Sequence, residues 1–264
     1  MAEIDYETEY RPSTLVPEYE QILERWAREA AAYRDAAAAA GRAELDLSFG
    51  DSERQRLDLF LPEQGSTGAL ALFIHGGWWR MLDRFSFSHM ARGLNARGIS
   101  VAVTSYDLCP QVSLAVIVEQ IRAACRFLYR RSGRPIAVFG HSAGGHLSAC
   151  MASSMASEVQ GGYAISSAFD LAPLLGVSMN EDWRLDAQSA HALSPLHWPA
   201  PRVFDCVVGA LESNEFRRQS RALAQAWGAR HEEIAGANHF TVLDPLTDPA
   251  SAMVARVAEM CEGG

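Results

Sequence analysis

Residues 135–154 read PIAVFGHSAGGHLSACMASS, an apolar run that passes through glycines into an alanine-rich segment. The apolar run predicts a buried strand and the later segment a helix, so Ser142 stands on the sharp turn between them. Gly140 and Gly144 lie two residues before and after the serine, where a Cβ would collide with the adjacent strand or the helix start. The stretch therefore predicts a serine nucleophile on the turn at the end of a strand.

A second pair of glycines lies about 65 residues earlier in the chain. The strand candidate ALALFIH at 69–75 runs directly into GGWW at 76–79. Two glycines permit a tight turn that aims backbone N–H groups at one point. We expect the N–H groups of Gly77 and Trp78 to meet that of Ala143, which starts the helix after the serine. These three amides would form an oxyanion hole.

The order of residues along the chain selects a base and an acid. His239 lies in IAGANHFTVLDPL, a Gly/Asn loop after the last short apolar run, and is expected to be the general base. Glu212 follows the strand candidate 202–209 by three residues and is expected to orient the imidazole. Glu215 remains its competitor, although a carboxylate in a first helical turn is commonly a partner of the helix dipole. Asp244 is expected to cap the final helix.

The other histidines do not show the spacing of a metal site. His141 and His146 flank the serine, but no carboxylate or thiolate completes a ligand set with them and His75. We expect no metal and no cofactor, and we expect His75 to hold the glycine loop by a hydrogen bond. The five cysteines are scattered without a CxxC pair, which is typical of buried free thiols.

A small aromatic substrate would need aromatic or polar walls around the serine. We expect Trp79, Tyr106 and His141 to contact the substrate. Five aromatic residues could either line the pocket or pack in the core, and both alternatives stay open for each of them. They are Trp78, Trp79, Phe85, Tyr106 and Trp183.

Short apolar runs alternate with helical patterns along the whole chain. The strand candidates are 44–50, 55–62, 69–75, 99–106, 135–140, 159–166 and 202–209, with a last short run near HEEIA, and the helical patterns are 86–97, 113–131, 142–156, 214–227 and 249–262. The first two runs, joined by the polar DSER, predict an antiparallel hairpin. The other runs are apolar throughout, which is typical of parallel strands buried on both faces. The fold class is therefore α/β, with a mostly parallel sheet of about eight strands and helices on both faces.

The chain of 264 residues is expected to form one main domain at 44–264. Residues 1–43 are predicted to be a helical extension, because 17–40 has apolar residues at helical spacing. This helix would lie either outside the domain or over the site. The segment from about 168 to 200 is too long for an ordinary connection and is predicted to be a small cap that shapes the substrate pocket.

The net charge of −9 opposes binding to nucleic acid or to an anionic membrane, because the field would repel both partners. No stretch approaches about 18 consecutive apolar residues, and the acidic start of the chain does not resemble a secretory signal. We expect a cytoplasmic protein whose partner is a small-molecule substrate, with a homodimer left open.

Four motifs together resemble the kynurenine formamidase branch of the esterase/lipase α/β hydrolases: HGGWW at 75–79, GHSAGG at 140–145, GALESNEFRRQS at 209–220 and GANHF at 236–240. The resemblance extends from about Leu45 to the C-terminus. It implies the α/β-hydrolase fold and hydrolysis of N-formylkynurenine to kynurenine and formate without a cofactor. It maps the acid onto Glu212, where the relatives carry Asp, and makes Glu215 a residue that packs beside the acid.

These residues predict a serine hydrolase that cleaves a small ester or amide through an acyl-enzyme. Ser142 would attack the carbonyl carbon and His239 would relay the proton. The resemblance favours an arylformamidase. A general short-chain carboxylesterase or thioesterase is the second hypothesis, and a non-catalytic ligand-binding homologue of the same fold is the third.

Overall fold

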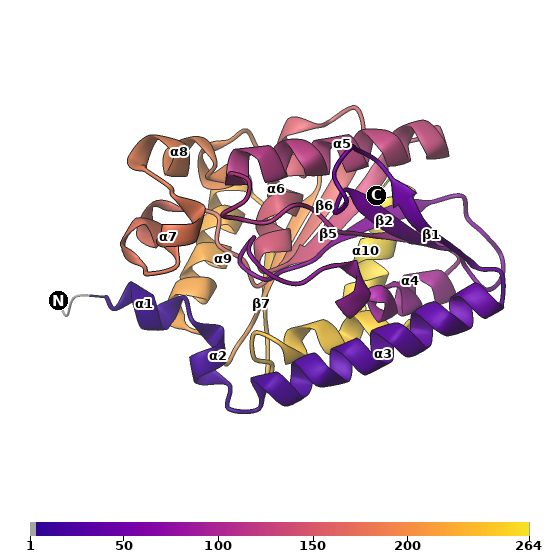
Figure 1. Ribbon diagram of the computed structural model, residues 1–264, viewed down its shortest axis with the longest axis horizontal. Helices are drawn as coiled ribbons and strands as arrows, with labels where there is room; N and C mark the ends of the chain where they lie inside the picture. Colours follow the sequence, from indigo (N-terminus) through magenta and orange to yellow (C-terminus); the bar gives the residue numbers. More distant parts are fainter. Residues whose placement is uncertain (1–3, 264) are drawn as a thin grey trace.

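A central sheet of eight strands organises the part of the chain that the computed structural model describes, residues 4–263 (Figure 1). The strands are β1 (Ala43–Ser48), β2 (Arg56–Phe60), β3 (Leu70–Ile74), β4 (Ser100–Thr104), β5 (Ile136–His141), β6 (Val159–Ile165), β7 (Phe204–Gly209) and β8 (Arg230–Ile234). Their order across the sheet is β1-β2-β4-β3-β5-β6-β7-β8. The pairs β1·β2 and β2·β4 are antiparallel and the remaining pairs are parallel. The predicted hairpin and the mostly parallel sheet are confirmed.

The strands at the middle of the sheet are buried on both faces. In β3, for example, Leu72 pairs with Ala102 on one side and with Val138 on the other, and every residue of the strand is buried. Continuous apolar runs suit such strands because helices cover both faces. The edge strand β8, with the sequence RHEEI, is only partly buried, which is why its charged residues are tolerated.

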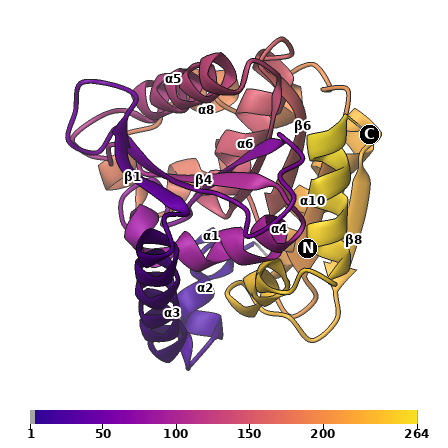
Figure 2. The same ribbon diagram turned by 90° about the vertical axis from the view of Figure 1, so that its right-hand side faces the viewer.

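Ten α-helices occur in the described residues: α1 (Tyr6–Glu9), α2 (Pro12–Leu15), α3 (Tyr19–Ala39), α4 (Arg92–Ala96), α5 (Leu114–Ser132), α6 (Ala143–Ser154), α7 (Asn180–Trp183), α8 (Ala187–Ala192), α9 (Asn214–Trp227) and α10 (Ala252–Glu262). Helices α5, α6 and α9 share one hydrophobic cluster with the sheet, and α3, α4 and α10 share the other. Figure 2 shows α5 and α3 on opposite sides of β4. The predicted helices on both faces are confirmed.

The helix predicted at 86–97 is wrong in part. The segment forms the 3₁₀ turns η1 (Arg84–Ser86) and η2 (Ser88–Ala91) and then the short α4. Serine and glycine have low helix propensity, and Ser86, Ser88 and Gly93 all fall in this segment.

Asp244 does not cap the final helix as expected. It lies in the 3₁₀ turn η5 (Thr241–Thr247) and pairs with Arg25 of α3, with 2.8 Å between Nη2 and Oδ1. Ser251 caps α10 instead, because its hydroxyl accepts the N–H of Val254 at 3.1 Å. The serine directly precedes the helix, where an N-cap has to stand.

The N-terminal segment starts beside α9 with α1, and its helix α3 then runs along one side of the sheet (Figure 1). Its long helix α3 buries Ile22, Trp26, Ala30, Tyr33 and Ala37, which recur every three or four residues and so share one face. The helix packs against η1 and η2. The division into an extension and a main domain stays a prediction.

Between β6 and β7 the chain forms the turn η3 (Ala172–Gly176), helices α7 and α8, and the turn η4 (Pro195–His197). We call residues 168–200 the insertion. Asn180 closes a compact loop in it, because its side chain accepts the N–H of Leu185 at 2.9 Å and donates to the carbonyl of the same residue at 3.0 Å. The role of the insertion as a cap stays a prediction.

Candidate active site

Ser142 stands between β5 and α6 with a positive φ of 54°. Its backbone N–H donates to the carbonyl of Ile165 on the next strand at 2.8 Å. A Cβ on Gly140 would lie 2.3 Å from the carbonyl oxygen of Gly144, and a Cβ on Gly144 would lie 1.9 Å from that of Ile74. Both positions therefore accept only glycine, and the strained turn presents the serine at the end of the strand.

Glu212 and His239 form a buried pair next to this turn. The Nδ1 atom of His239 lies 2.7 Å from Oε2 of Glu212. The other carboxylate oxygen, Oε1, accepts the N–H of Gly209 at 2.7 Å and the hydroxyl of Ser166. Because a carboxylate only accepts hydrogen bonds, the hydrogen of the imidazole lies on Nδ1 and leaves the Nε2 lone pair free. The pair has the form of an oriented general base.

One cavity of about 320 Å³ is lined by both Ser142 and His239. His141, the residue before the serine, donates from Nε2 to the carbonyl of His239 at 2.7 Å and so ties the base loop to the nucleophile turn. Burial, together with the neighbouring His239, lowers the pKa of His141 well below its usual range, so His141 is neutral. Among residues 4–263 no hydrogen bond joins the Ser142 hydroxyl to the His239 ring, and such contacts commonly tighten only when substrate binds.

The glycine loop packs directly against the nucleophile. A Cβ on Gly76 would lie 3.1 Å from the Cβ of Ser142. Gly77, Trp78 and Trp79 follow with positive φ values of 101°, 53° and 57°. A side chain on Gly77 would meet the carbonyl oxygen of Met81 at 2.3 Å, so the loop requires glycine there. Three successive residues with positive φ turn the loop sharply over the serine.

The backbone N–H groups of Gly77, Trp78 and Ala143 have no acceptor within the described part of the chain. The N–H of Ala143 belongs to the first residue of α6, at the positive end of the helix dipole. Unpaired backbone donors beside a buried serine are suited to an anionic oxygen. This arrangement supports the predicted oxyanion hole, whose role stays a proposal.

Trp79 and Tyr106 do not lie where a substrate contact requires them. They are 1% and 0% exposed, and neither lines the cavity. Tyr106 supports the glycine loop from the core, since its hydroxyl donates to the carbonyl of His75 at 2.9 Å and its ring stacks on the His75 ring at 4.2 Å. His75 in turn donates from Nδ1 to the carbonyl of Gly76 at 2.7 Å, and burial lowers its pKa to about 3. Of the three expected contact residues only His141 lines the cavity.

Several walls of the cavity come from segments that motifs did not identify. The N-terminal segment contributes Arg11, Pro12, Ser13, Tyr19, Leu23 and Trp26, the glycine loop contributes Gly77, Trp78, Arg80, Met81 and Leu82, and the remaining lining residues are His141, Ser142, Met179, His239 and Phe240. The start of α3 therefore lies over the site, a choice that the sequence left open. The amphipathic helix before the first strand was the one signal for it.

Glu215, the competing acid, faces the N-terminal segment and makes no hydrogen bond to His239. Its Oε2 accepts the hydroxyl of Tyr10 at 2.9 Å, and its carboxylate pairs with Arg218 at 2.7 Å. The Tyr10 hydroxyl also accepts an N–H of Gln219 at 2.8 Å, and burial raises its pKa. Glu215 therefore anchors the N-terminal segment to α9.

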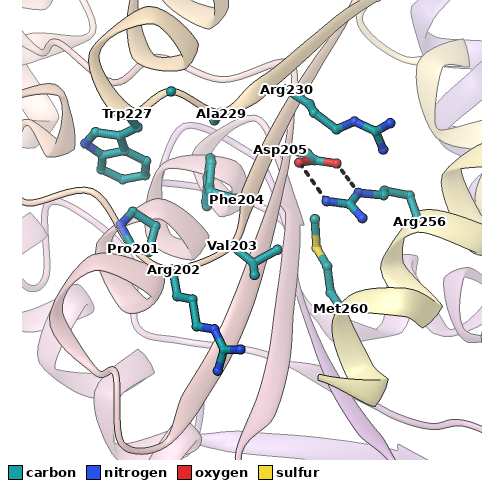
Figure 3. A pocket seen from close by; sticks show the side chains of 11 residues that line it. Pro201, Arg202, Val203, Phe204, Asp205, Trp227, Ala229, Arg230, Arg256 and Met260 are labelled. Carbon is teal, nitrogen blue, oxygen red and sulfur yellow. Dashed lines mark hydrogen bonds and ion pairs between the residues drawn. The ribbon is translucent and has the colours of Figure 1, made fainter. Parts of the chain in front are cut away.

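A second cavity, also of about 320 Å³, lies at the amino-terminal end of β7 (Figure 3). There Asp205 pairs with Arg256 at 2.5 Å, and Trp227 and Arg230 form other parts of the wall. Glu212 follows the opposite end of the same strand. None of the predicted site residues lines this cavity.

Within residues 4–263 no three His, Cys, Asp or Glu side chains gather closely enough to hold a metal ion. The five cysteines are free and buried. No helix in the same described range is long and apolar enough to cross a membrane. The expected cytoplasmic location stays a prediction.

Comparison with known proteins places the chain among hydrolases. The family model BD-FAE matches residues 57–188. The chain is 28% identical over 227 residues to kynurenine formamidase of Salmo salar and 25% identical over 225 residues to that of Danio rerio, and each match covers 77% of both chains. A candidate thioesterase of Silicibacter sp. TM1040 shares 36% identity, with a TM-score of 0.90 over 97% of this chain and 99% of that one. An esterase of Pyrobaculum calidifontis, 19% identical, has the same fold, with a TM-score of 0.70 over 91% of this chain and 93% of that one.

Proposed function

The chain belongs to the BD-FAE family, within the esterase branch of the α/β hydrolases, and we propose that this serine hydrolase cleaves its substrate through an acyl-enzyme on Ser142. One observation carries the assignment of residues. Ser142 and His239 line the same cavity, and the ring of His239 is held by Glu212 at 2.7 Å. A nucleophile, a base and an acid from three distant segments meet beside unpaired backbone amides, as serine catalysis requires.

The first half of the reaction makes the acyl-enzyme. Oγ of Ser142 bonds to the carbonyl carbon while its proton moves to Nε2 of His239. The carbonyl oxygen becomes an oxyanion that the N–H groups of Gly77, Trp78 and Ala143 stabilise. The intermediate then collapses, the bond to the leaving amine or alcohol breaks, and the imidazolium returns its proton to that leaving group.

The second half regenerates the enzyme. Water attacks the acyl carbon, gives its proton to His239 and displaces Oγ of Ser142, which is then reprotonated by the imidazolium. Glu212 stabilises each imidazolium through its contact with Nδ1. The two donors on the far oxygen of Glu212 keep the carboxylate in place throughout. No step needs a cofactor.

Charge in the cavity favours a substrate that carries a carboxylate. Arg11 and Arg80 line the cavity, whereas no Asp or Glu stands among its described lining residues. Each arginine has a carboxylate partner, because Arg11 pairs with Glu7 of α1 at 2.6 Å and Arg80 with Asp182 of the insertion at 2.9 Å. These pairs are solvent-exposed and therefore weak enough to be shared with a ligand.

The rest of the wall is mostly apolar and aromatic, with Trp26, Trp78 and Phe240 among its residues. An aryl formamide with a carboxylate group suits both parts of the wall. N-formylkynurenine is such a compound, and two relatives are named kynurenine formamidase. We therefore propose arylformamidase activity. The neighbouring esterases and the candidate thioesterase keep short acyl esters and thioesters as the second candidate.

Two measurements test these assignments. A Ser142→Ala protein should lose turnover of p-nitrophenyl acetate and labelling by a fluorophosphonate probe, and retained turnover would contradict the acyl-enzyme mechanism. A panel that compares kcat/KM for N-formylkynurenine with that for acetyl and butyryl esters decides the substrate class. A wild-type protein that neither reacts with the probe nor turns over any of these compounds would instead be a ligand-binding homologue.

The arginine argument has its own matched control. Arg80→Met should raise KM for N-formylkynurenine about tenfold, the loss expected for one charged hydrogen bond, and leave p-nitrophenyl acetate unaffected. Arg230→Met removes the same charge at the second cavity, where Figure 3 shows Arg230, and should change neither substrate. An equal effect of both variants, or none of either, would remove the carboxylate from the proposal.

A further inference from the structure

The glycine loop holds an unfavourable backbone conformation. Trp78 and Trp79 both have positive φ, at 53° and 57°, directly after Gly77 at 101°. For a residue with a Cβ this conformation costs about 1–2 kcal/mol. The loop therefore needs bonds from its surroundings to keep its shape, and the carbonyl groups of residues 76–79 can each be traced to a donor.

These carbonyls of the loop are held in different ways. That of Gly77 accepts the N–H groups of Arg80 and Met81 at 3.0 and 3.1 Å, inside the loop. The carbonyl of Trp79 accepts a backbone N–H at 2.8 Å, from Cys109 after β4. The carbonyl of Gly76 is held by the side chain of the adjacent His75, and that of Trp78 by a side chain from a distant segment.

That side chain is Trp183, at the end of α7 in the insertion. Its indole N–H donates to the carbonyl oxygen of Trp78 at 2.7 Å. Trp183 is 2% exposed, and its ring lies 5.4 Å from the ring of Trp78 and 5.6 Å from that of Trp79. The preceding residue, Asp182, adds the ion pair to Arg80 at 2.9 Å. The insertion thus contacts the loop by a hydrogen bond, by packing and by charge.

The contact of Trp183 with the loop matters for catalysis because it fixes a peptide group next to the proposed oxyanion donors. The bonds to the Gly77 carbonyl hold the peptide that carries the Trp78 N–H, and the indole holds the next peptide at the Trp78 carbonyl. An oxyanion donor must keep its direction to within about 10–20° to be effective. We propose that Trp183 is a positioning residue that holds the oxyanion amides of Gly77 and Trp78 in place, an inference that rests on the proposed function.

The insertion then takes part in transition-state stabilisation although it supplies none of the proposed catalytic groups. Loss of the indole N–H would free the peptide between Trp78 and Trp79 to rotate, and the movement would pass through Trp78 to the adjoining peptide that carries the Trp78 N–H. This would weaken binding of the oxyanion more than binding of the ground-state carbonyl. This predicts a fall in kcat with little change in KM. A residue needed only for folding would change the amount of active enzyme, and would not lower the affinity of the folded enzyme for an analogue of the oxyanion.

The test removes the indole N–H and keeps an aromatic ring at position 183. Trp183→Phe should lower kcat for p-nitrophenyl acetate about ten- to hundredfold, less than outright removal of an oxyanion donor, with KM within about twofold of wild type. Its affinity for a trifluoromethyl ketone, which binds as a tetrahedral adduct, should fall by the same factor as kcat/KM. Affinity for a non-covalent product-like inhibitor should not fall. If Trp183→Phe does not fold, 3-benzothienylalanine at position 183 keeps the bicyclic shape and lacks the N–H.

Trp227→Phe is the matched control. The indole N–H of Trp227 also donates to a backbone carbonyl, that of Trp198 at 3.1 Å, but Trp227 lines the second cavity (Figure 3). This variant should keep wild-type kcat and inhibitor affinity. Unchanged affinity of the Trp183 variant for the trifluoromethyl ketone, in a protein whose wild type shows turnover that depends on Ser142, would overturn the positioning role alone. Absence of turnover that depends on Ser142 would overturn the proposed function first.

Discussion

Replacement of Glu212 by Gln would determine whether the acid acts through the tautomer of His239. In the structure Oε1 of Glu212 accepts the N–H of Gly209 and the hydroxyl of Ser166, while Oε2 faces Nδ1 of His239. A backbone N–H can only donate, so a carboxamide would keep its oxygen at the Oε1 site and point its NH₂ group at Nδ1. His239 would then carry its hydrogen on Nε2, where it cannot take the proton of Ser142.

The cost of the opposite orientation sets the size of the effect. Turning the amide over restores the active tautomer but sets its NH₂ group against the N–H of Gly209. Two buried donors would then lack acceptors, and each costs about 1–3 kcal/mol. The two together cost about 2–6 kcal/mol, and at about 1.4 kcal/mol per factor of ten the active orientation falls to about one molecule in 30 to one in 10⁴. We expect Glu212→Gln to lower kcat by this factor, with the folded structure kept.

The assay is steady-state hydrolysis of p-nitrophenyl acetate, with thermal unfolding measured in parallel. Glu215→Gln is the control, because it removes an equally buried carboxylate that contacts Tyr10 and Arg218 instead of His239. It should lower the melting temperature and leave kcat within about twofold. A Glu212→Gln enzyme with more than a tenth of wild-type kcat would refute the tautomer argument.

Three further predictions concern stability. Gly144→Ala would set a Cβ 1.9 Å from the carbonyl oxygen of Ile74, and urea denaturation should show a loss of at least about 3 kcal/mol or no folded protein. Burial lowers the pKa of His146 from 6.5 to about 4, so the unfolded chain binds more protons between these values and the free energy of unfolding falls as pH drops. His146→Gln should remove about 2 kcal/mol of that fall between pH 7 and 4.5, as measured by urea denaturation at several pH values. If the free energy of unfolding fell equally with pH in the variant and in the wild type, the result would contradict this prediction. Tyr10→Phe leaves Glu215 and Gln219 short of a partner and should cost about 1–3 kcal/mol, with faster trypsin cleavage near the N-terminus as the sign of a released segment.

The parts of the molecule that the sequence predicted are those set by local rules. A strand buried on both faces must be apolar throughout, so the run at 135–140 was recognisable as β5 without its neighbours. The turn at Ser142 was recognisable because a Cβ at Gly140 or Gly144 would meet backbone atoms of the turn and of the neighbouring strand, whatever side chains surround them. The roles assigned to His239 and Glu212 came from chain order, which the sheet topology converts into proximity.

The walls of the cavity follow no local rule. The N-terminal segment, which supplies part of the wall, is anchored by Tyr10 and Glu215, which are 205 residues apart in the chain, and neither carries a signal that the other will meet it. Trp78 and Trp79 are adjacent and share a positive φ, yet the first lines the cavity and the second packs in the core. Hydrophobicity alone does not distinguish two such neighbours, because the choice depends on which elements pack against each ring.

Chemistry and specificity therefore come from different levels of this fold. Ser142 and the amides next to it stand at strand ends, so sheet topology brings them together in any protein of this build. Arg11 comes from the N-terminal segment, and Arg80, from the glycine loop, is held by Asp182 of the insertion, so the substrate charge that the cavity favours depends on packing between distant segments. Motifs can identify the hydrolase while leaving its substrate open. Substitutions that change the preferred substrate should therefore concentrate in the N-terminal segment and the insertion and spare the strand ends.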